Sequence, residues 1–185
     1  MRYRLAALIF LGAIAVPFCA QAANGVTGNG LGANGKLING GRPLKHVAFP
    51  PIRDWSSLRI TLHRSGCFGR CPAYGVEIHG DGTVIYKGER FVAVTGEQTA
   101  KIPESKVRAL FALFRKGNYF WLHDRYAARV TDLPTFVTSI SYDGHSKQVG
   151  DYAGHWIGMP DIVNQIELAI DDAADTEQWT KGAAH

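Results

Sequence analysis

The sequence predicts an α+β fold, in which an antiparallel β-sheet of about five to six strands carries two amphipathic helices packed on one face. Short segments with alternating apolar and polar residues predict the strands, and two segments with apolar residues at helical spacing predict the helices. The strands follow one another before each helix, instead of alternating with helices one by one. That order favours antiparallel pairing, with the helices gathered on one face.

The first half of the sequence predicts strands joined by glycine-containing turns. Leu58, Ile60 and Leu62 alternate with polar residues, as in a half-buried strand. Gly80-Asp81-Gly82 predicts a hairpin turn, because glycine and aspartate tolerate positive φ. The strands expected here lie at residues 57–64, 74–79, 83–87 and 90–102, the last with a kink at Gly96.

Two segments that follow a proline predict the helices. The first begins at Pro103 and has a basic last turn followed by a glycine stop. A second hairpin, 136–142 with 145–152, precedes the second helix, and its Asp143-Gly144 turn is typical of type I′. The second helix begins at Pro160. Its expected buried side consists of Ile162, Val163, Ile166, Ala169, Ile170 and Ala173.

Residues 1–22 have the pattern of a secretory signal peptide. Arg2 and Arg4 precede an apolar run of 14 residues, and Ala20-Gln21-Ala22 supplies the small residues that a signal peptidase requires. The run is shorter than the roughly 20 residues that a membrane-spanning helix needs. We therefore expect cleavage after Ala22, a periplasmic or secreted protein, and no membrane span in the mature chain.

The mature chain is expected to hold one domain. Residues 23–46 are rich in glycine and asparagine and offer little to bury, so they are interpreted as a flexible linker. A single α+β domain is expected at residues 47–179, because roughly 130 residues are enough to form a core. Residues 180–185 are interpreted as a disordered C-terminal tail.

The charge of the chain argues against a nucleic-acid partner. The chain has 20 Lys and Arg against 16 Asp and Glu, and loss of Arg2 and Arg4 with the signal peptide leaves 18 against 16. The net charge then falls from +4 to +2, and the remaining basic residues are scattered. Nucleic-acid-binding proteins instead concentrate them on one surface.

Cys67 and Cys71 are the only cysteines of the expected mature chain. In an exported protein, two cysteines this close, flanked by glycine and proline, predict a structural disulfide. Closing so small a loop stabilises the fold by about 2 kcal/mol. A redox-active pair normally has two intervening residues and stands at the start of a helix, and a metal site would need two further ligands. Neither alternative is favoured, and no cofactor or metal is expected.

Binding residues are expected on the cysteine loop and on the stretch from Arg125 to Pro134. Binding residues concentrate on loops held by rigid supports, and a disulfide would make this loop rigid. The candidates are Arg64, Phe68, Arg70, Arg125, Tyr126 and Asp132. Whether the two loops meet depends on the strand order, which the sequence leaves open.

No catalytic residue is assigned from the sequence. A nucleophile elbow of the type Gly-x-Ser-x-Gly is missing. If the first two strands pair with His63 opposite Gly75, His79 falls opposite Arg59, about 13 Å from His63, and the two histidines cannot share a ligand. Three further histidines near helix ends and turns are interpreted as solvated: His123, His145 and His155.

Four motifs together resemble one bacterial family, the domain of unknown function numbered 6438. The motifs are Gly66-Cys67-Phe68-Gly69-x-Cys71-Pro72-x-Tyr74, Gly80-Asp81-Gly82-x-Val84-x-Tyr86-x-Gly88, Thr131-Asp132-Leu133-Pro134 and Lys147-x-Val149-x-Asp151-Tyr152. The resemblance runs from about Leu58 to Trp179. It implies an exported or envelope setting in bacteria, and it supplies no activity, substrate or catalytic residue.

The leading interpretation is a non-enzymatic binding or interaction module of the bacterial cell envelope, with an envelope protein or a small ligand as its partner. Two alternatives stay open. One is an enzyme of unrecognised type that uses Asp132 and a histidine. The other is a thiol-disulfide protein that uses Cys67 and Cys71.

The signal peptide gives a first testable prediction. The mature protein should begin at Ala23 and be soluble, because the apolar run ends before the expected cleavage site. N-terminal sequencing of the exported protein measures this directly. A mature chain that starts at a lipidated Cys19, or that retains Arg2, would contradict the prediction.

Overall fold

The computed structural model describes residues 29–31, 37–39, 42–43 and 47–181. The expected signal peptide lies outside the described residues, as do residues 182–185 of the expected tail. Within the expected linker, three short strands form a small antiparallel sheet, and the rest lies outside the description. They are β1 (Asn29–Leu31), β2 (Leu37–Asn39) and β3 (Arg42–Pro43).

A seven-stranded sheet with the order β7-β6-β5-β4-β9-β10-β8 forms the centre of the domain. Neighbouring strands are antiparallel, except that β8 runs parallel to β10. The strands are β4 (Arg59–Arg64), β5 (Ala73–His79), β6 (Thr83–Arg90), β7 (Gly96–Lys101), β8 (Arg125–Ala127), β9 (Phe136–Tyr142) and β10 (His145–Tyr152).

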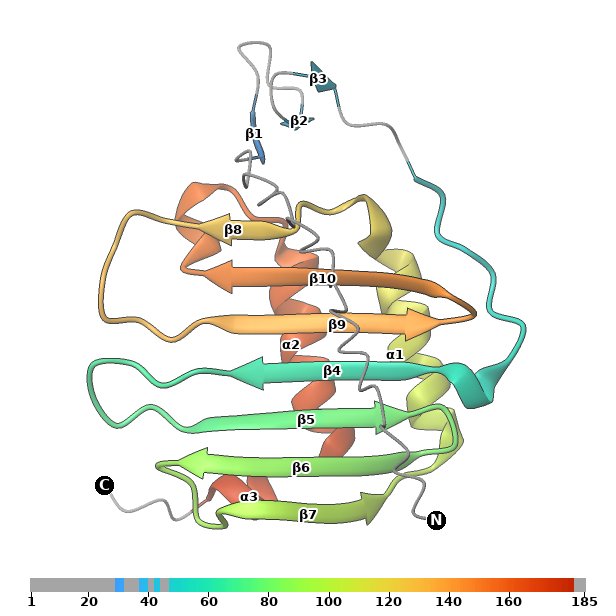
Figure 1. Ribbon diagram of the computed structural model, residues 1–185, viewed down its shortest axis with the longest axis vertical. Coiled ribbons are helices and arrows are strands. Elements are labelled where there is room, and N and C mark those ends of the chain that lie inside the picture. The colour runs from blue at the N-terminus through green and yellow to red at the C-terminus, as the bar shows by residue number, and fades with distance from the viewer. Residues whose placement is uncertain (1–28, 32–36, 40–41, 44–46, 182–185) are drawn as a thin grey trace, which may run out of the picture.

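Two main helices cover one face of this sheet, as Figure 1 shows, so the predicted α+β fold is confirmed. They are α1 (Glu104–Lys116) and α2 (Asp161–Ala174), and the short α3 (Glu177–Thr180) follows α2. Gly117 ends α1, as its position in the sequence predicts. Single turns of 3-10 helix lie at Trp55–Ser57, Tyr119–Trp121 and Gly154–Ile157.

The register assumed above for the first two strands is the one that the structure has. His63 pairs with Gly75 and Arg59 pairs with His79 in the antiparallel pair of β4 and β5. Because side chains alternate across a strand, Ile60 and Leu62 of β4 lie on the same face, and both are buried under the helices, as is the preceding Leu58. The core therefore forms between that face and the apolar sides of α1 and α2.

The strand expected at residues 90–102 is wrong in its first half. The preceding strand β6 extends to Arg90, and β7 begins only at Gly96. A Cβ atom at Gly88 would lie 2.1 Å from the carbonyl oxygen of Val94, so the turn folds back closely on β6. The amide of Val94 donates a hydrogen bond to the carbonyl of Trp179, which ties this turn to α3.

Glu167 lies on α2, as the helical pattern predicts. The sequence gives no reason to expect this charged residue in the core. Its side chain faces inward and the residue is only 2% exposed. Burial and the neighbouring Asp151 carboxylate raise the pKa of Glu167 to about 7, although a hydrogen bond from Asn164 partly opposes the shift. This carboxyl group is therefore largely protonated below neutral pH.

No helix within residues 47–181 is both long enough and apolar enough to span a membrane.

Glu167 makes the stability of the domain depend on pH. Its pKa is about 7 in the folded protein, against 4.5 for an unperturbed glutamate, so the folded state binds the proton more tightly than the unfolded state. The free energy of unfolding should fall as pH rises from about 4.5 to about 7, by up to about 3 kcal/mol. Urea titrations at pH 5 and pH 8 measure the difference.

The variant Glu167→Gln should remove most of this pH dependence and should stabilise the domain at pH 8. Glu97→Gln on the exposed strand β7 is the matched control and should leave the dependence in place. Equal pH dependence in the parent protein and in Glu167→Gln would contradict the assignment.

Candidate functional site

Strands β4, β6, β8 and β10 run in the same direction, so the connections that follow them leave the sheet at the same end. The arrowheads of β4, β6 and β8 all point to the left in Figure 1, and the connections that follow these strands lie together there. We call residues 65–72, 90–95 and 128–135 the loop surface. It contains the cysteine loop and most of the second stretch in which the sequence predicts binding residues.

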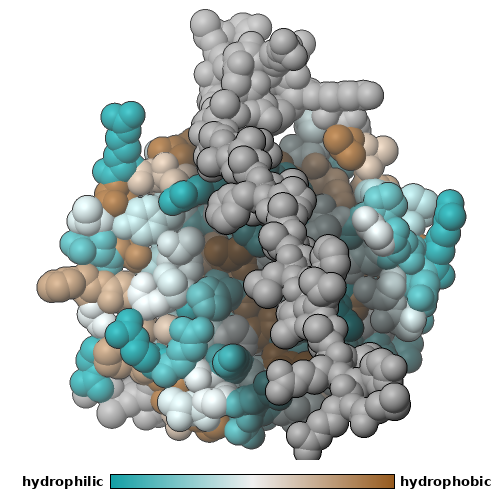
Figure 2. All heavy atoms as spheres, in the orientation of Figure 1, coloured by the Kyte–Doolittle hydropathy of each residue, from teal (hydrophilic) through white to brown (hydrophobic). Residues whose placement is uncertain are grey.

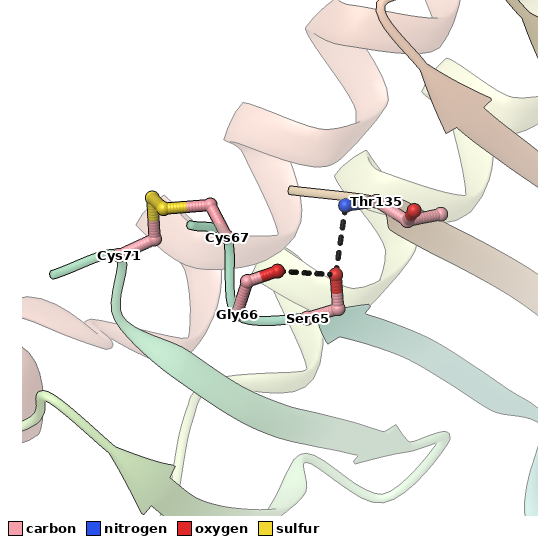
Figure 3. The surroundings of a disulfide bond; sticks show 5 residues. All are labelled: Ser65, Gly66, Cys67, Cys71 and Thr135. Carbon is pink, nitrogen blue, oxygen red and sulfur yellow. Dashed lines mark hydrogen bonds between the residues drawn. A yellow bond between two sulfur atoms is a disulfide. The ribbon is translucent and has the colours of Figure 1, made fainter. Parts of the chain in front are cut away.

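A disulfide closes the cysteine loop, as the sequence predicts. Cys67 and Cys71 are bonded, with their Cα atoms 5.6 Å apart. Figure 3 shows the disulfide beside the start of the strand that follows Thr135. The bond restricts the backbone of the three residues between the cysteines, which are Phe68, Gly69 and Arg70.

Ser65 joins the cysteine loop to the 128–135 loop. Its amide donates a hydrogen bond of 2.9 Å to the carbonyl of Thr135, and the amide of Thr135 donates one of 2.8 Å to the Ser65 hydroxyl oxygen. The Ser65 hydroxyl in turn donates to the carbonyl of Gly66 (Figure 3). The two loops therefore meet, and the pairing of β4 with β9 is the reason.

A further backbone hydrogen bond fixes the tip of the cysteine loop. The amide of Phe68 donates to the carbonyl of Asp132, over 3.2 Å. Asp132 has a φ of 72°, in the left-handed region that aspartate tolerates better than most residues. Its carboxylate accepts a hydrogen bond from the hydroxyl of Thr131. Asp132 thus has a turn-forming role beside Phe68.

Phe68 is the most exposed large apolar side chain of the described part of the chain, with 88% of the residue open to solvent. Figure 2 shows an apolar projection on the left side of the molecule, where the loop between β4 and β5 lies in Figure 1. Leu133 and Phe91 of the neighbouring loops are also exposed. The loop surface therefore presents apolar side chains from all three of its segments.

Arginines border these apolar side chains. The guanidinium carbons of Arg70 and Arg90 lie 5.9 and 5.7 Å from the centre of the Phe91 ring. Arg90 also packs across the cysteine loop, because a Cβ atom at Gly66 would lie only 2.7 Å from one of its guanidinium nitrogens. A glycine at position 66 is what permits this close approach.

Arg64, another candidate, points away from the loop surface and toward α2. Its side chain is 17% exposed and pairs with the carboxylate of Asp171. The guanidinium carbon lies 4.4 Å from the centre of the Phe136 ring. Asp171 also accepts hydrogen bonds from the hydroxyls of Tyr74 and Thr176. Burial and the Asp171 carboxylate raise the pKa of Tyr74, so it stays a donor.

A cavity of about 220 Å³ lies between the cysteine loop, the 128–135 loop and the end of α3. It is lined by Cys71, Pro72, Pro134 and Phe136, together with Arg64, Tyr74 and Thr180. The two prolines, the disulfide-bonded Cys71 and the aromatic rings make much of its lining apolar. Arg64 reaches this cavity with its charge already balanced by Asp171.

The candidates Arg125 and Tyr126 lie at the far edge of the sheet, on β8. Arg125 is exposed, whereas Tyr126 is buried and belongs to the core. The hydroxyl of Tyr126 accepts a hydrogen bond from the amide of His123, and burial raises the pKa of Tyr126. Tyr126 therefore supports β8 from within and offers no side chain to a partner.

The histidines do not complete a catalytic site with Asp132 within residues 47–181, where its carboxylate contacts no imidazole. His63 pairs with Glu89 on the open face of the sheet, and His79 contacts Arg59 and Glu77 there. His145 and His155 are exposed, as expected, but the interpretation of His123 as solvated is wrong.

His123 is buried beside Tyr126, and burial lowers its pKa. The described residues also contain no cluster of three or more histidine, cysteine or acidic side chains that could hold a metal ion.

Residues 58–174 match the model of the family described as Domain of unknown function (DUF6438). The chain belongs to this family. The resemblance that the four sequence motifs suggest is thereby confirmed, and the match spans the sheet from β4 to β10 and both main helices. No curated protein matches the chain.

Sequence reasoning missed Arg90 and Phe91 as members of the loop surface, because both were placed inside a strand. The glycine at position 96 was the available signal for the turn. In the structure Gly96 has a φ of 82° and is the first residue of β7. Asp171 was missed as the partner of Arg64. The sequence around a single aspartate on an amphipathic helix does not indicate which strand residue it pairs with.

The disulfide gives the prediction for this site. Intact mass after alkylation without reductant should show no added alkyl group, and reduction of the unfolded protein should allow two. The double variant Cys67→Ser/Cys71→Ser should lower the melting temperature by roughly 5–10 °C, which corresponds to about 2 kcal/mol. Its far-UV circular dichroism should be unchanged. Two alkyl groups on the unreduced native protein would disprove the disulfide and revive the redox alternative.

Proposed function

We propose that this domain is a non-enzymatic binding module of the bacterial cell envelope and that it contacts a partner protein through the loop surface. The exposure of Phe68 carries the proposal. A large apolar side chain held 88% in solvent on a tightly restrained loop gives the folded domain no benefit by itself. Its burial against a partner would supply that benefit.

The restraint of the loop supports a role in binding. A loop that is already ordered loses little conformational entropy when a partner docks, so more of the contact energy appears as affinity. The cysteine loop is held by its disulfide, by the hydrogen bonds of Ser65 and by the bond from Phe68 to Asp132. The three segments present aromatic, leucine and arginine side chains, and aromatic residues and arginine are enriched among residues that dominate protein interfaces.

The cellular setting rests on two further observations. Residues 1–22 carry the pattern of an export signal. A structural disulfide persists in oxidising compartments such as the periplasm and is rare in the cytosol. Both support an exported protein.

The test compares two double variants of the mature protein in capture experiments with periplasmic extract. Arg70→Ala/Leu133→Ser removes a cation and an apolar side chain from the loop surface. It should reduce capture of the specific partner at least about tenfold, with little change in melting temperature, because exposed side chains contribute little to stability.

Arg115→Ala/Leu168→Ala removes the same residue types from the exposed sides of α1 and α2 and is the matched control. It should bind as the parent protein does. The proposal is wrong if the loop-surface variant retains every partner of the parent protein, or if only the helical control loses them.

A further inference from the structure

We infer that Phe68 is an anchor that inserts into an apolar pocket bordered by carboxylates on a partner protein. This inference rests on the proposed function and specifies the chemistry of the partner. It follows from three properties of the loop surface, which are its protruding shape, the fixed direction of the cysteine loop and the excess of positive charge.

Phe68 protrudes, and the loop holds it there. The residue is followed by Gly69 and Arg70 inside the disulfide-closed ring, so no long segment is free to fold the side chain back onto the domain. Its amide is bonded to the carbonyl of Asp132. A protruding aromatic side chain can lose its solvent exposure only in a concave site, which the partner must supply.

The charge of the loop surface selects an acidic partner. Its three segments contain Arg70, Arg90 and Arg129 but only one acidic residue, Asp132. Arg90 makes no ion pair with a carboxylate of the described residues, and its guanidinium lies against Phe91. Arginines around an apolar anchor pair well with carboxylates that surround a pocket, and such complementarity also speeds association.

The same charge argues against a second copy of this chain as the partner. Two loop surfaces brought face to face would place arginines opposite arginines, and like charges across an interface are unfavourable. The only arginine that lines the neighbouring cavity of about 220 Å³ is Arg64, whose charge Asp171 balances, so the cavity offers no charge that would offset this repulsion. An acidic protein with its own pocket fits the surface better.

The test places a photoreactive amino acid, p-benzoylphenylalanine, at position 68 of the full chain and irradiates cells that export it. A second protein carries it at position 156, because Trp156 is also an exposed aromatic residue (60%) but lies outside the loop surface. Position 68 should give one discrete adduct and position 156 none. Mass spectrometry of the adduct should map the cross-link to an apolar pocket with acidic residues at its border.

Affinity for the partner so identified then tests the two halves of the inference. Phe68→Ala should weaken binding roughly ten- to a hundredfold, as expected for loss of a fully buried phenylalanine side chain. Arg90→Gln should slow association and reduce its dependence on salt concentration. Trp156→Ala should bind as the parent protein does, and all three variants should keep the parent melting temperature.

The outcomes separate the inference from the proposed function. An adduct from position 156 but not from position 68 leaves a binding module and overturns the anchor. A cross-link from position 68 to a second copy of this chain, or association that is insensitive to salt, overturns the acidic partner. No adduct from either position, together with unchanged capture by the loop-surface double variant, overturns the proposed function itself.

Discussion

The pairing of β4 with β9 is the interaction on which the rest of the structure depends. It joins segments that are distant in the sequence. Thr61 and Ser139, for example, are 78 positions apart, and their hydroxyls share a hydrogen bond. Through it, the hairpin of β5 and β6 and the hairpin of β9 and β10 become one sheet. The same pairing brings the end of β4 beside the start of β9, so the loop that leaves β4 and the loop that enters β9 lie in contact. Without it, neither the continuous core nor the loop surface would form.

The ion pair of Arg64 and Asp171 secures the helical layer next to this junction. Arg64 is the last residue of β4, and Asp171 lies on α2, so the pair links the sheet to the helix just behind the cysteine loop. Removing either partner from a largely buried pair leaves an uncompensated charge, which costs far more than the pair itself contributes. The hydroxyls of Tyr74 and Thr176 satisfy the remaining acceptor sites of the carboxylate. This network gives Arg64, at the edge of the loop surface, a structural role.

The fold was predictable where the signal is local, and the site was predictable only in part. Alternation of side chains along β4 and β5 was enough to identify both strands and their buried faces, because one face of each strand is apolar. The three residues of β8 are too few for such a pattern, and Tyr126 reads equally well as an exposed or a buried aromatic residue. The disulfide could be inferred from spacing and export. The contact between the two loops could not be inferred, because it follows from the strand order. The sequence of neither segment indicates which distant strand it pairs with. Glu167 shows the same limit of sequence-based prediction. Helical periodicity indicates which positions face inward, but it does not indicate which groups surround a carboxylate there.

In the small ring closed by Cys67 and Cys71, the side chain exposed to solvent is different from the groups that hold the loop in place. Its anchoring contacts use backbone groups and the Ser65 hydroxyl, whereas the side chain of Phe68 takes no part in those hydrogen bonds. Substitution of Phe68 would therefore change the exposed surface of the loop and leave these anchoring contacts in place. Proteins built on this framework can therefore differ in the side chain at the loop tip while they keep the contacts that hold the loop in place.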